Sequence, residues 1–148
     1  MSYKRTLYLS ENHSDPDPEG LLQKRDHVIP KYSYSAIYDE PSFDYVMVKT
    51  SENAMRERGG SLYIATNRFW RAGERISDYT YVVSVVDQIV QQVYIADTWF
   101  KFSDGKYAGR WGFFGRTAYG EEFDSLIGKR IPEKYRAYGN ASPVLYKK

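Results

Sequence analysis

Hydrophobic and aromatic residues occur in short runs along the chain, and most runs have the β-branched and aromatic content that favours strands. The richest runs are Tyr79–Val86 and Ile89–Ala96, separated by Asp87-Gln88 alone. This spacing predicts a β-hairpin, with one long bent strand as the alternative. The other strands that the pattern predicts are Tyr3–Ser10, Phe43–Thr50, Ser61–Asn67, Trp99–Phe102, Arg110–Phe114 and Val144–Tyr146.

Polar stretches between these runs predict short helices and turns. Ser51–Arg58 begins at a serine that can cap a helix and is followed by two glycines that can end it. Pro18–Asp26 and Glu121–Ile127 are the other expected helices. Asp104-Gly105 and Asn140–Pro143 are expected turns.

The order of the elements predicts the fold class. Neighbouring strands in the second half are joined by short turns, which favours antiparallel pairs, and strands and helices do not alternate regularly as in a doubly wound sheet. We therefore expect an α+β fold, with a mostly antiparallel curved sheet or small open barrel and two or three short helices. A single domain is expected over residues 1–148, with a mixed N-terminal part (1–60) and a strand-rich, basic-aromatic core (61–148).

The amino-acid composition limits the kinds of chemistry that the protein can carry out. The 148 residues are 42% hydrophobic and 17% aromatic, enough to bury a core. There is no Cys, which excludes disulfides, thiolate nucleophiles and Cys-ligated metals, and there are only two His. No metal or cofactor is expected. The net charge is +2, and residues 61–148 hold 13 Lys/Arg against 9 Asp/Glu, so positive charge accompanies the most aromatic segments.

Location is expected to be cytoplasmic. No window approaches the ~18 apolar residues of a membrane span, and the N-terminus has no long apolar stretch after its basic residues. No membrane partner is therefore expected.

Two basic-aromatic segments are candidate ligand sites. In residues 67–75, Asn67, Arg68 and Arg71 surround Trp70. Arginine can contact phosphate, and an indole offers a face on which a base can stack. The alternative is that Trp70 lies in the core and the arginines form its solvated rim.

The second segment, residues 109–116, places Arg110 and Arg116 beside Trp111 among three glycines. It could form a pocket for a flat ligand, or a twisted strand whose glycines relieve crowding. Trp70, Trp99 and Trp111 together could form an aromatic cage for a base or a cation. The alternative is that most of them are core residues.

The densest basic run could contact phosphates, or be a solvated face diluted by Glu133. It contains Lys129, Arg130, Lys134 and Arg136.

Catalytic chemistry has weak support. His13 lies in a Ser/Asp/Pro-rich segment that we expect to be mobile, and His27 follows Asp26 without a recognisable motif. Carboxylate pairs such as Glu74 with Asp78, or Glu121 with Asp124, remain open as acid/base groups. The spacing of Asp15, Asp17 and Glu19 does not match a calcium-binding loop.

Several runs resemble a known kind of domain. LYIATNRFWRAG (62–73), YVVSVV (81–86), IVQQVYI (89–95), RWGFFG (110–115) and GK (128–129) with NASPVLY (140–146) are similar to small bacterial and phage domains. These share an LYxAT…WxxG start, a hairpin, an RWxFxG strand and an Asn-Pro-like turn. Here that turn contains Ala141 and Ser142 between its Asn and Pro, a departure from the pattern, and residues 1–60 stay unassigned.

The layout also resembles the PUA-like group, which includes EVE and ASCH modules. These are small open barrels that bind RNA or modified bases in an aromatic-lined pocket. The resemblance implies that Asn67, Arg68, Trp70, Arg110 and Trp111 line such a pocket.

The expected function is a non-enzymatic module that binds nucleic acid or nucleotide through an aromatic pocket and arginine contacts to phosphate. One alternative is a protein-interaction or accessory factor, of the anti-defence type, of a phage or mobile element. Its surface would be the tyrosine-rich stretch Tyr32–Tyr45 or a homodimer interface. A small nucleotide-processing enzyme using Glu74, Asp78 or His27 is the other alternative.

Overall fold

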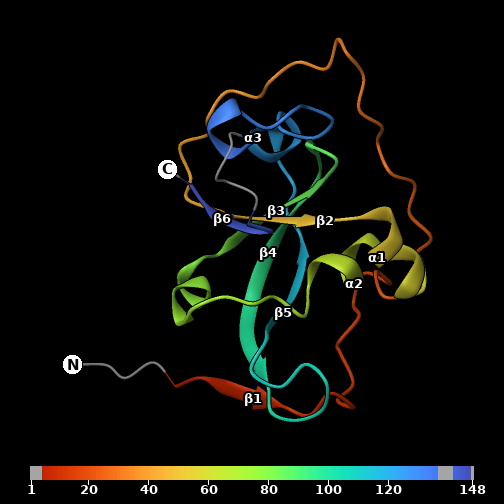
Figure 1. The fold of residues 1–148 in the computed structure, drawn as a ribbon, viewed down its shortest axis with the longest axis vertical. Helices are drawn as coiled ribbons and strands as arrows, with labels where there is room; N and C mark the ends of the chain where they lie inside the picture. The colour runs from red at the N-terminus through yellow and green to blue at the C-terminus, as the bar shows by residue number, and fades with distance from the viewer. Residues whose placement is uncertain (1–4, 137–141, 148) are drawn as a thin grey trace.

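The computed structural model describes residues 5–136 and 142–147, in which one open sheet is flanked by short helices (Figure 1). The strands are β1 (Leu7–Leu9), β2 (Val46–Thr50), β3 (Tyr81–Val86), β4 (Ile89–Phe102), β5 (Trp111–Thr117) and β6 (Val144–Tyr146). The helices are α1 (Glu52–Glu57), α2 (Leu62–Thr66) and α3 (Glu121–Asp124), with 3-10 turns η1 (Glu74–Asp78) and η2 (Glu133–Tyr135). The α+β class is confirmed.

The sheet has the order β1-β4-β3-β2-β6, and β5 pairs with β4. It does not close on itself, so it is a curved sheet and not a closed barrel. Antiparallel pairs join β2–β6, β3–β4 and β4–β5, whereas β2–β3 and β1–β4 are parallel. The parallel pair β2–β3 is connected through α1 and α2, a strand-helix-strand unit that the sequence pattern did not indicate.

Strand β4 organises the sheet. It merges the two strands expected at Ile89–Ala96 and Trp99–Phe102, and the predicted hairpin with β3 is confirmed. Along one edge, β3 pairs as far as Ile95 and β1 begins opposite Phe100, while β5 pairs along the other edge. The part of β4 between Ile95 and Phe100 therefore pairs with neither β3 nor β1 on this edge. It borders a hollow that is described below.

Two expected elements are wrong. Ser61–Asn67 forms helix α2 instead of a strand, with the Ser61 hydroxyl accepting from the Ile64 N–H (3.2 Å) as an N-cap. A short apolar run of this kind fits either element, and burial in the core decides between them. Pro18–Asp26 forms turns and is not helical. Its Leu22 N–H donates to the Asp17 carboxylate (3.2 Å), and its Asp26 carboxylate accepts from the Leu62 N–H (2.7 Å).

The remaining expected strands and helices are confirmed, and the bounds of most of them differ by a few residues. Helix α1 has Ser51 as its N-cap, and α3 covers the start of the expected Glu121–Ile127 helix. Strand β2 begins at Val46 and β6 spans Val144–Tyr146. The expected turn Asn140–Pro143 lies partly outside the described residues.

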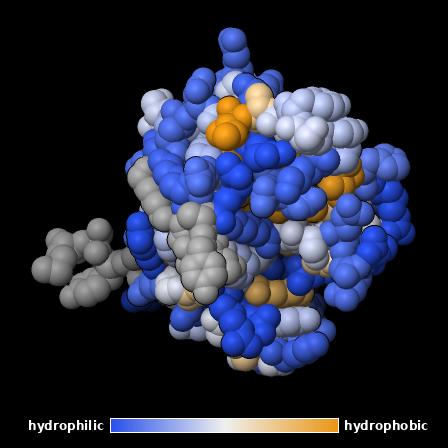
Figure 2. Space-filling view, turned by 45° about the horizontal axis from the view of Figure 1, so that its top comes forward, coloured by the Kyte–Doolittle hydropathy of each residue, from blue (hydrophilic) through white to orange (hydrophobic). Residues whose placement is uncertain are grey.

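Both faces of the sheet are buried. Along β2, Val46 and Val48 pack on one face with α2 and Trp70, whereas Met47 packs on the other face with Phe123 of α3. Alternation of successive side chains explains this division. Figure 2 shows a mostly hydrophilic surface with separate hydrophobic spots. The large exposed hydrophobic residues are Leu7, Tyr8, Tyr32, Tyr34, Ile37 and Tyr119.

Residues 5–60 are an integral part of the fold. The segment 10–41 runs along the molecule from β1 to the region of α3 (Figure 1), and β2 lies inside the sheet. Gln91 of β4 holds this segment through both main-chain groups of Ile29, accepting from its N–H (2.7 Å) and donating to its carbonyl (3.0 Å).

Candidate functional site

A basic hollow of about 360 Å³ brings together two predicted site residues, Arg71 and Arg110, with Lys106. Trp70 and Trp111 exchange main-chain hydrogen bonds (3.0 and 2.8 Å), which sets the chain after Trp70 beside the chain before Trp111. The turn at residues 103–109, predicted from its Asp-Gly pair, brings Lys106 to the same place. The backbone of Ala72, Ala108 and Gly109 completes the lining.

The hollow is electropositive. Its lining contains no acidic residue, and among the described residues no carboxylate pairs with Arg71, Lys106 or Arg110. Glu11 and Asp104 approach the same turn, but Asp104 accepts from the Glu11 N–H (3.0 Å) and Glu11 from the Lys106 N–H (3.2 Å). Three cations that form no ion pair within the described residues thus lie around one concavity, an arrangement that favours anion binding.

An aromatic pair supports the cations. Tyr107 stacks on Phe69 with ring centroids 3.7 Å apart, and the Arg110 and Lys106 cationic groups lie 5.1 and 5.4 Å from the Tyr107 ring. Arg58 lies 4.9 Å from the Phe69 ring, and burial lowers the pKa of this arginine. The group thus combines π faces with positive charge.

Phe69 is held in a conformation that favours glycine. Its φ of 73° lies in the left-handed region, where a bulky residue costs about 1–3 kcal/mol. The turn places the Phe69 ring on Tyr107, while Trp70 enters the core. Such strain is concentrated at functional sites, and here it adjoins the basic hollow.

Asn67 and Arg68 are structural in this fold. Asn67 is fully buried, and its amide donates to the Phe113 carbonyl (3.1 Å). Arg68 forms an ion pair with Asp15 and donates to the Asn67 side-chain oxygen (2.7 Å). Burial lowers the pKa of Arg68 to about 10, so its charge is retained at neutral pH and is compensated by Asp15.

The tryptophans do not form the three-membered cage. Trp70 (8% exposed) and Trp111 (1%) lie in the core, and their indole N–H groups donate to the carbonyls of Thr66 (2.6 Å) and Ala72 (3.1 Å). The core interpretation of Trp70 is therefore correct. Neither ring offers a stacking face in the basic hollow.

The glycines around Trp111 relieve crowding. A Cβ on Gly112 would lie 2.7 Å from Phe100 and 2.9 Å from the Asn67 carbonyl. A Cβ on Gly115 would lie 2.1 Å from the Ile95 carbonyl. The twisted-strand interpretation of this segment fits these contacts of Gly112 and Gly115, whereas Gly109 lies in the lining of the basic hollow.

The other predicted basic residues are engaged elsewhere. Arg116 pairs with Asp97 (3.2 Å) and Lys134 with Glu40 (3.0 Å). Arg130 donates to the Tyr32 carbonyl (2.8 Å) and Arg136 to the Ile131 carbonyl (2.9 Å), while Lys129 is partly buried. Most of the cationic side chains in the run 129–136 therefore form bonds to neighbouring parts of the protein.

Sequence reasoning missed a buried polar cluster. The expectation that His13 is mobile is wrong: its ring packs edge-on against Phe100 (5.0 Å) and Phe114 (5.5 Å), and Nε2 lies 2.5 Å from Asp15 Oδ1. Asp17 and Glu19 point to other partners, the N–H groups of Leu22 and Thr117. The partners are far apart in the sequence, so no local pattern indicated the cluster.

The residues considered for catalysis do not converge. His27 is exposed and lines a hollow of about 190 Å³ with Asp26 and Glu52. Glu74 accepts from the Thr6 hydroxyl (3.2 Å). In the part of the chain that the structure describes, no group of three or more His, Asp or Glu side chains could hold a metal ion.

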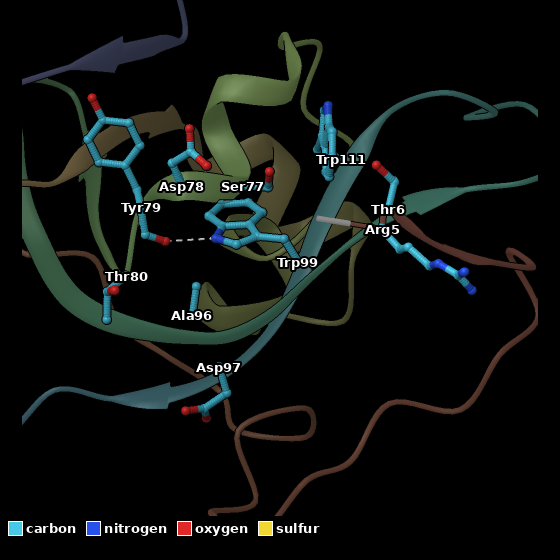
Figure 3. Close-up of a pocket in the computed structure, with 10 residues that line it drawn as sticks. All are labelled: Arg5, Thr6, Ser77, Asp78, Tyr79, Thr80, Ala96, Asp97, Trp99 and Trp111. Atoms are coloured by element: carbon cyan, nitrogen blue, oxygen red, sulfur yellow. Dashed lines mark hydrogen bonds between the residues drawn. The ribbon is translucent and has the colours of Figure 1, made fainter. Parts of the chain in front are cut away.

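A second hollow, of about 280 Å³, lies at the edge of β4 between β3 and β1 (Figure 3). Trp99 and Trp111 both line it, together with Asp78, Asp97 and Thr80. Trp99 is partly exposed, and its indole N–H donates to the Tyr79 carbonyl (2.8 Å).

Comparisons with known proteins returned nothing: a scan against family models, a search of curated proteins and a search of solved structures each found no match. Within residues 5–136 and 142–147, no helix has the length and apolar character needed to cross a bilayer.

Proposed function

We propose that this protein is a non-enzymatic module that binds a phosphate-containing ligand of the nucleic-acid class at the basic hollow. The observation that carries the proposal is the convergence of Arg71, Lys106 and Arg110 on one concavity whose lining has no acidic residue. Arginine and lysine side chains in this setting contact phosphate oxygens, with arginine able to do so bidentately.

The aromatic pair favours nucleic acid over a simple anion. The guanidinium groups of Arg58 and Arg110 lie over the rings of Phe69 and Tyr107, which also stack on each other. The planar groups that this surface offers a base are therefore guanidinium groups supported by aromatic rings. The resemblance to PUA-like modules implies the same ligand class and stays a prediction.

The test is fluorescence anisotropy with labelled 12-nucleotide RNA, single-stranded DNA and duplex DNA, and with free nucleotides as competitors, at two salt concentrations. Neutralised phosphates release counterions, so log K should fall with log[salt] by about 0.7–0.9 per contact. Replacing Arg71, Lys106 or Arg110 by Ala should weaken binding and make that slope shallower.

Arg56→Ala is the matched control, because Arg56 is exposed and pairs with Glu52 on the surface of α1 (3.8 Å). Its affinity should equal that of the unmodified protein. Binding that is insensitive to salt, or unaffected by all three substitutions in the hollow, would contradict the proposal.

A protein-interaction surface is the second candidate, on a different observation. The Tyr32 and Tyr34 rings stack at 5.0 Å and are 47% and 79% exposed, and Ile37 beside them is 51% exposed. Aromatic side chains anchor interfaces. If the surface mediates a homodimer or an accessory-factor contact, Tyr34→Ala should abolish the association. Sedimentation of the protein alone tests the homodimer.

A further inference from the structure

The hollow over Trp99 differs in character from the basic hollow. Its floor is an indole ring, and Figure 3 shows Trp99 in the middle of the lining residues, with Asp78 on one side and Asp97 on the other. The ring is fixed by its hydrogen bond to the Tyr79 carbonyl and packs on Phe113 (5.0 Å). It therefore presents a flat, preformed surface.

The lining of this hollow carries charges of both signs. Asp78 and Asp97 line it together with Arg5. Arg116 lies outside the lining and pairs with Asp97 (3.2 Å), which offsets part of the negative charge. Hydroxyl groups of Thr6 and Thr80 add polar atoms to the lining. A flat floor with a polar lining that carries both signs of charge fits an uncharged planar ring with hydrogen-bonding edges.

The two hollows adjoin at Trp111. This residue lines the Trp99 hollow, and its indole N–H donates to the carbonyl of Ala72 (3.1 Å), which lines the basic hollow beside Arg71. A ligand whose phosphate lies in the basic hollow therefore lies close to the Trp99 hollow.

We propose that the Trp99 hollow takes one nucleobase of the ligand whose phosphate lies in the basic hollow, and that it prefers bases bearing an amino group over uracil. The inference rests on the proposed function. The preference follows from Asp78 and Asp97, because ionised carboxylates only accept hydrogen bonds. Adenine, cytosine and guanine present exocyclic amino groups with two donor hydrogens, whereas uracil has no amino group and presents a single ring N–H between two carbonyl oxygens.

The test compares RNA hexamers 5′-UUUXUU that differ only at X. All carry the same phosphates, so the basic hollow alone predicts equal affinities. We expect hexamers with A, C or G at X to bind about 5-fold or more tightly than the hexamer with U, and Asp97→Asn to reduce this difference. Asp87→Asn, at an exposed aspartate in the β3–β4 turn, is the control and should preserve it.

Tryptophan fluorescence locates the base. Trp99 is the partly exposed tryptophan, whereas Trp70 and Trp111 are buried, so binding should quench emission in the unmodified protein and not in Trp99→Phe. Trp99→Ala should weaken binding about 5-fold or more through lost stacking. Because this variant also loses the bond to Tyr79, its folding is checked by circular dichroism, and Trp99→Phe and Asp97→Asn carry the test if it unfolds.

The outcomes separate the two proposals. Equal affinities for all four hexamers, with binding still lost in Arg71→Ala and Arg110→Ala, would overturn the base site and leave the phosphate site standing. Absence of binding to every hexamer would overturn both. Quenching of Trp99 by spermidine and not by the hexamers would identify a cation site and overturn the base assignment.

Discussion

Arg68 and Asp15 form an ion pair that joins the end of helix α2 to the N-terminal segment, 53 residues away in the sequence. The side chains are 17% and 4% exposed. Asp15 also faces His13, and Arg68 also bonds to Asn67, so the pair lies within a small polar cluster beneath Phe100 and Phe114. It fixes the start of the segment that leads to Arg71 in the basic hollow.

Asp15→Ala should destabilise the protein strongly. Arg68 keeps its charge at neutral pH because its lowered pKa is still about 10, and the substitution leaves that charge buried without its partner. Breaking one side of a buried ion pair costs about 3–5 kcal/mol. Urea denaturation followed by circular dichroism measures the loss.

Asp97→Ala is the matched control, because it breaks the Asp97–Arg116 pair, whose side chains are 47% and 53% exposed. Exposed pairs contribute about 0–1 kcal/mol. Similar losses in the two variants would show that burial of the Arg68–Asp15 pair is not what determines its contribution.

Alkaline pH should destabilise the protein through its buried tyrosines. Burial raises the pKa of Tyr38, Tyr45, Tyr63 and Tyr94, and for Tyr45 a hydrogen bond to Glu40 adds to the effect. Their ordinary pKa is about 10. Below that value both states are protonated and this stability is fully present. Above it the unfolded state loses protons first, so stability falls by about 1.4 kcal/mol per pH unit for each such tyrosine until its folded pKa is reached.

Urea midpoints at pH 8, 10 and 11 measure this slope. Tyr45→Phe removes one titrating group and should make the fall between pH 10 and 11 shallower by about 1 kcal/mol, because the unfolded tyrosine is half-ionised at pH 10. Tyr34→Phe, at a ring that is 79% exposed, should change nothing. Ordinary titration of all tyrosines in the folded protein, followed by absorbance at 295 nm, would refute the explanation.

Elements with a strong local signal were predictable. The β3–β4 hairpin has two runs rich in β-branched residues around a two-residue link, and Asp87 and Gln88 both have the positive φ such a turn requires. Helix α1 has its serine cap. In contrast, Ser61–Asn67 has no local feature that separates a buried helix from a strand.

The candidate site was only partly predictable for the same reason. Arg71 and Arg110 were candidates because each stands beside a tryptophan, and the structure places them around one hollow. Arg68 belongs to the same motif, yet it turns to Asp15, which no local spacing could indicate. Lys106 lies in an ordinary hairpin turn, and its contribution depends on tertiary structure alone.

Gly112→Ala should destabilise the start of β5. Its added methyl would lie 2.7 Å from the Phe100 ring and 2.9 Å from the Asn67 carbonyl, and both neighbours are themselves fully buried. Overpacking of this kind costs about 1–3 kcal/mol. Gly73→Ala, where an added Cβ meets nothing within 4 Å, is the control. Equal urea midpoints for the two variants would mean that β5 can shift to accept the methyl group.

Gln91→Leu should release the N-terminal segment from the sheet. Gln91 is 6% exposed, and its amide bonds to both main-chain groups of Ile29, which leucine cannot do. Loss of two such bonds costs about 1–3 kcal/mol, so local opening should become about 5- to 150-fold more frequent. Limited trypsinolysis measures this opening, because Lys31 lies two residues beyond Ile29 and is exposed. Gln92→Leu is the control, since the Gln92 side chain accepts from the adjacent Val93 N–H (3.1 Å). Faster cleavage at Lys31 in Gln91→Leu alone would establish the clamp, and equal cleavage rates in the two variants would refute it.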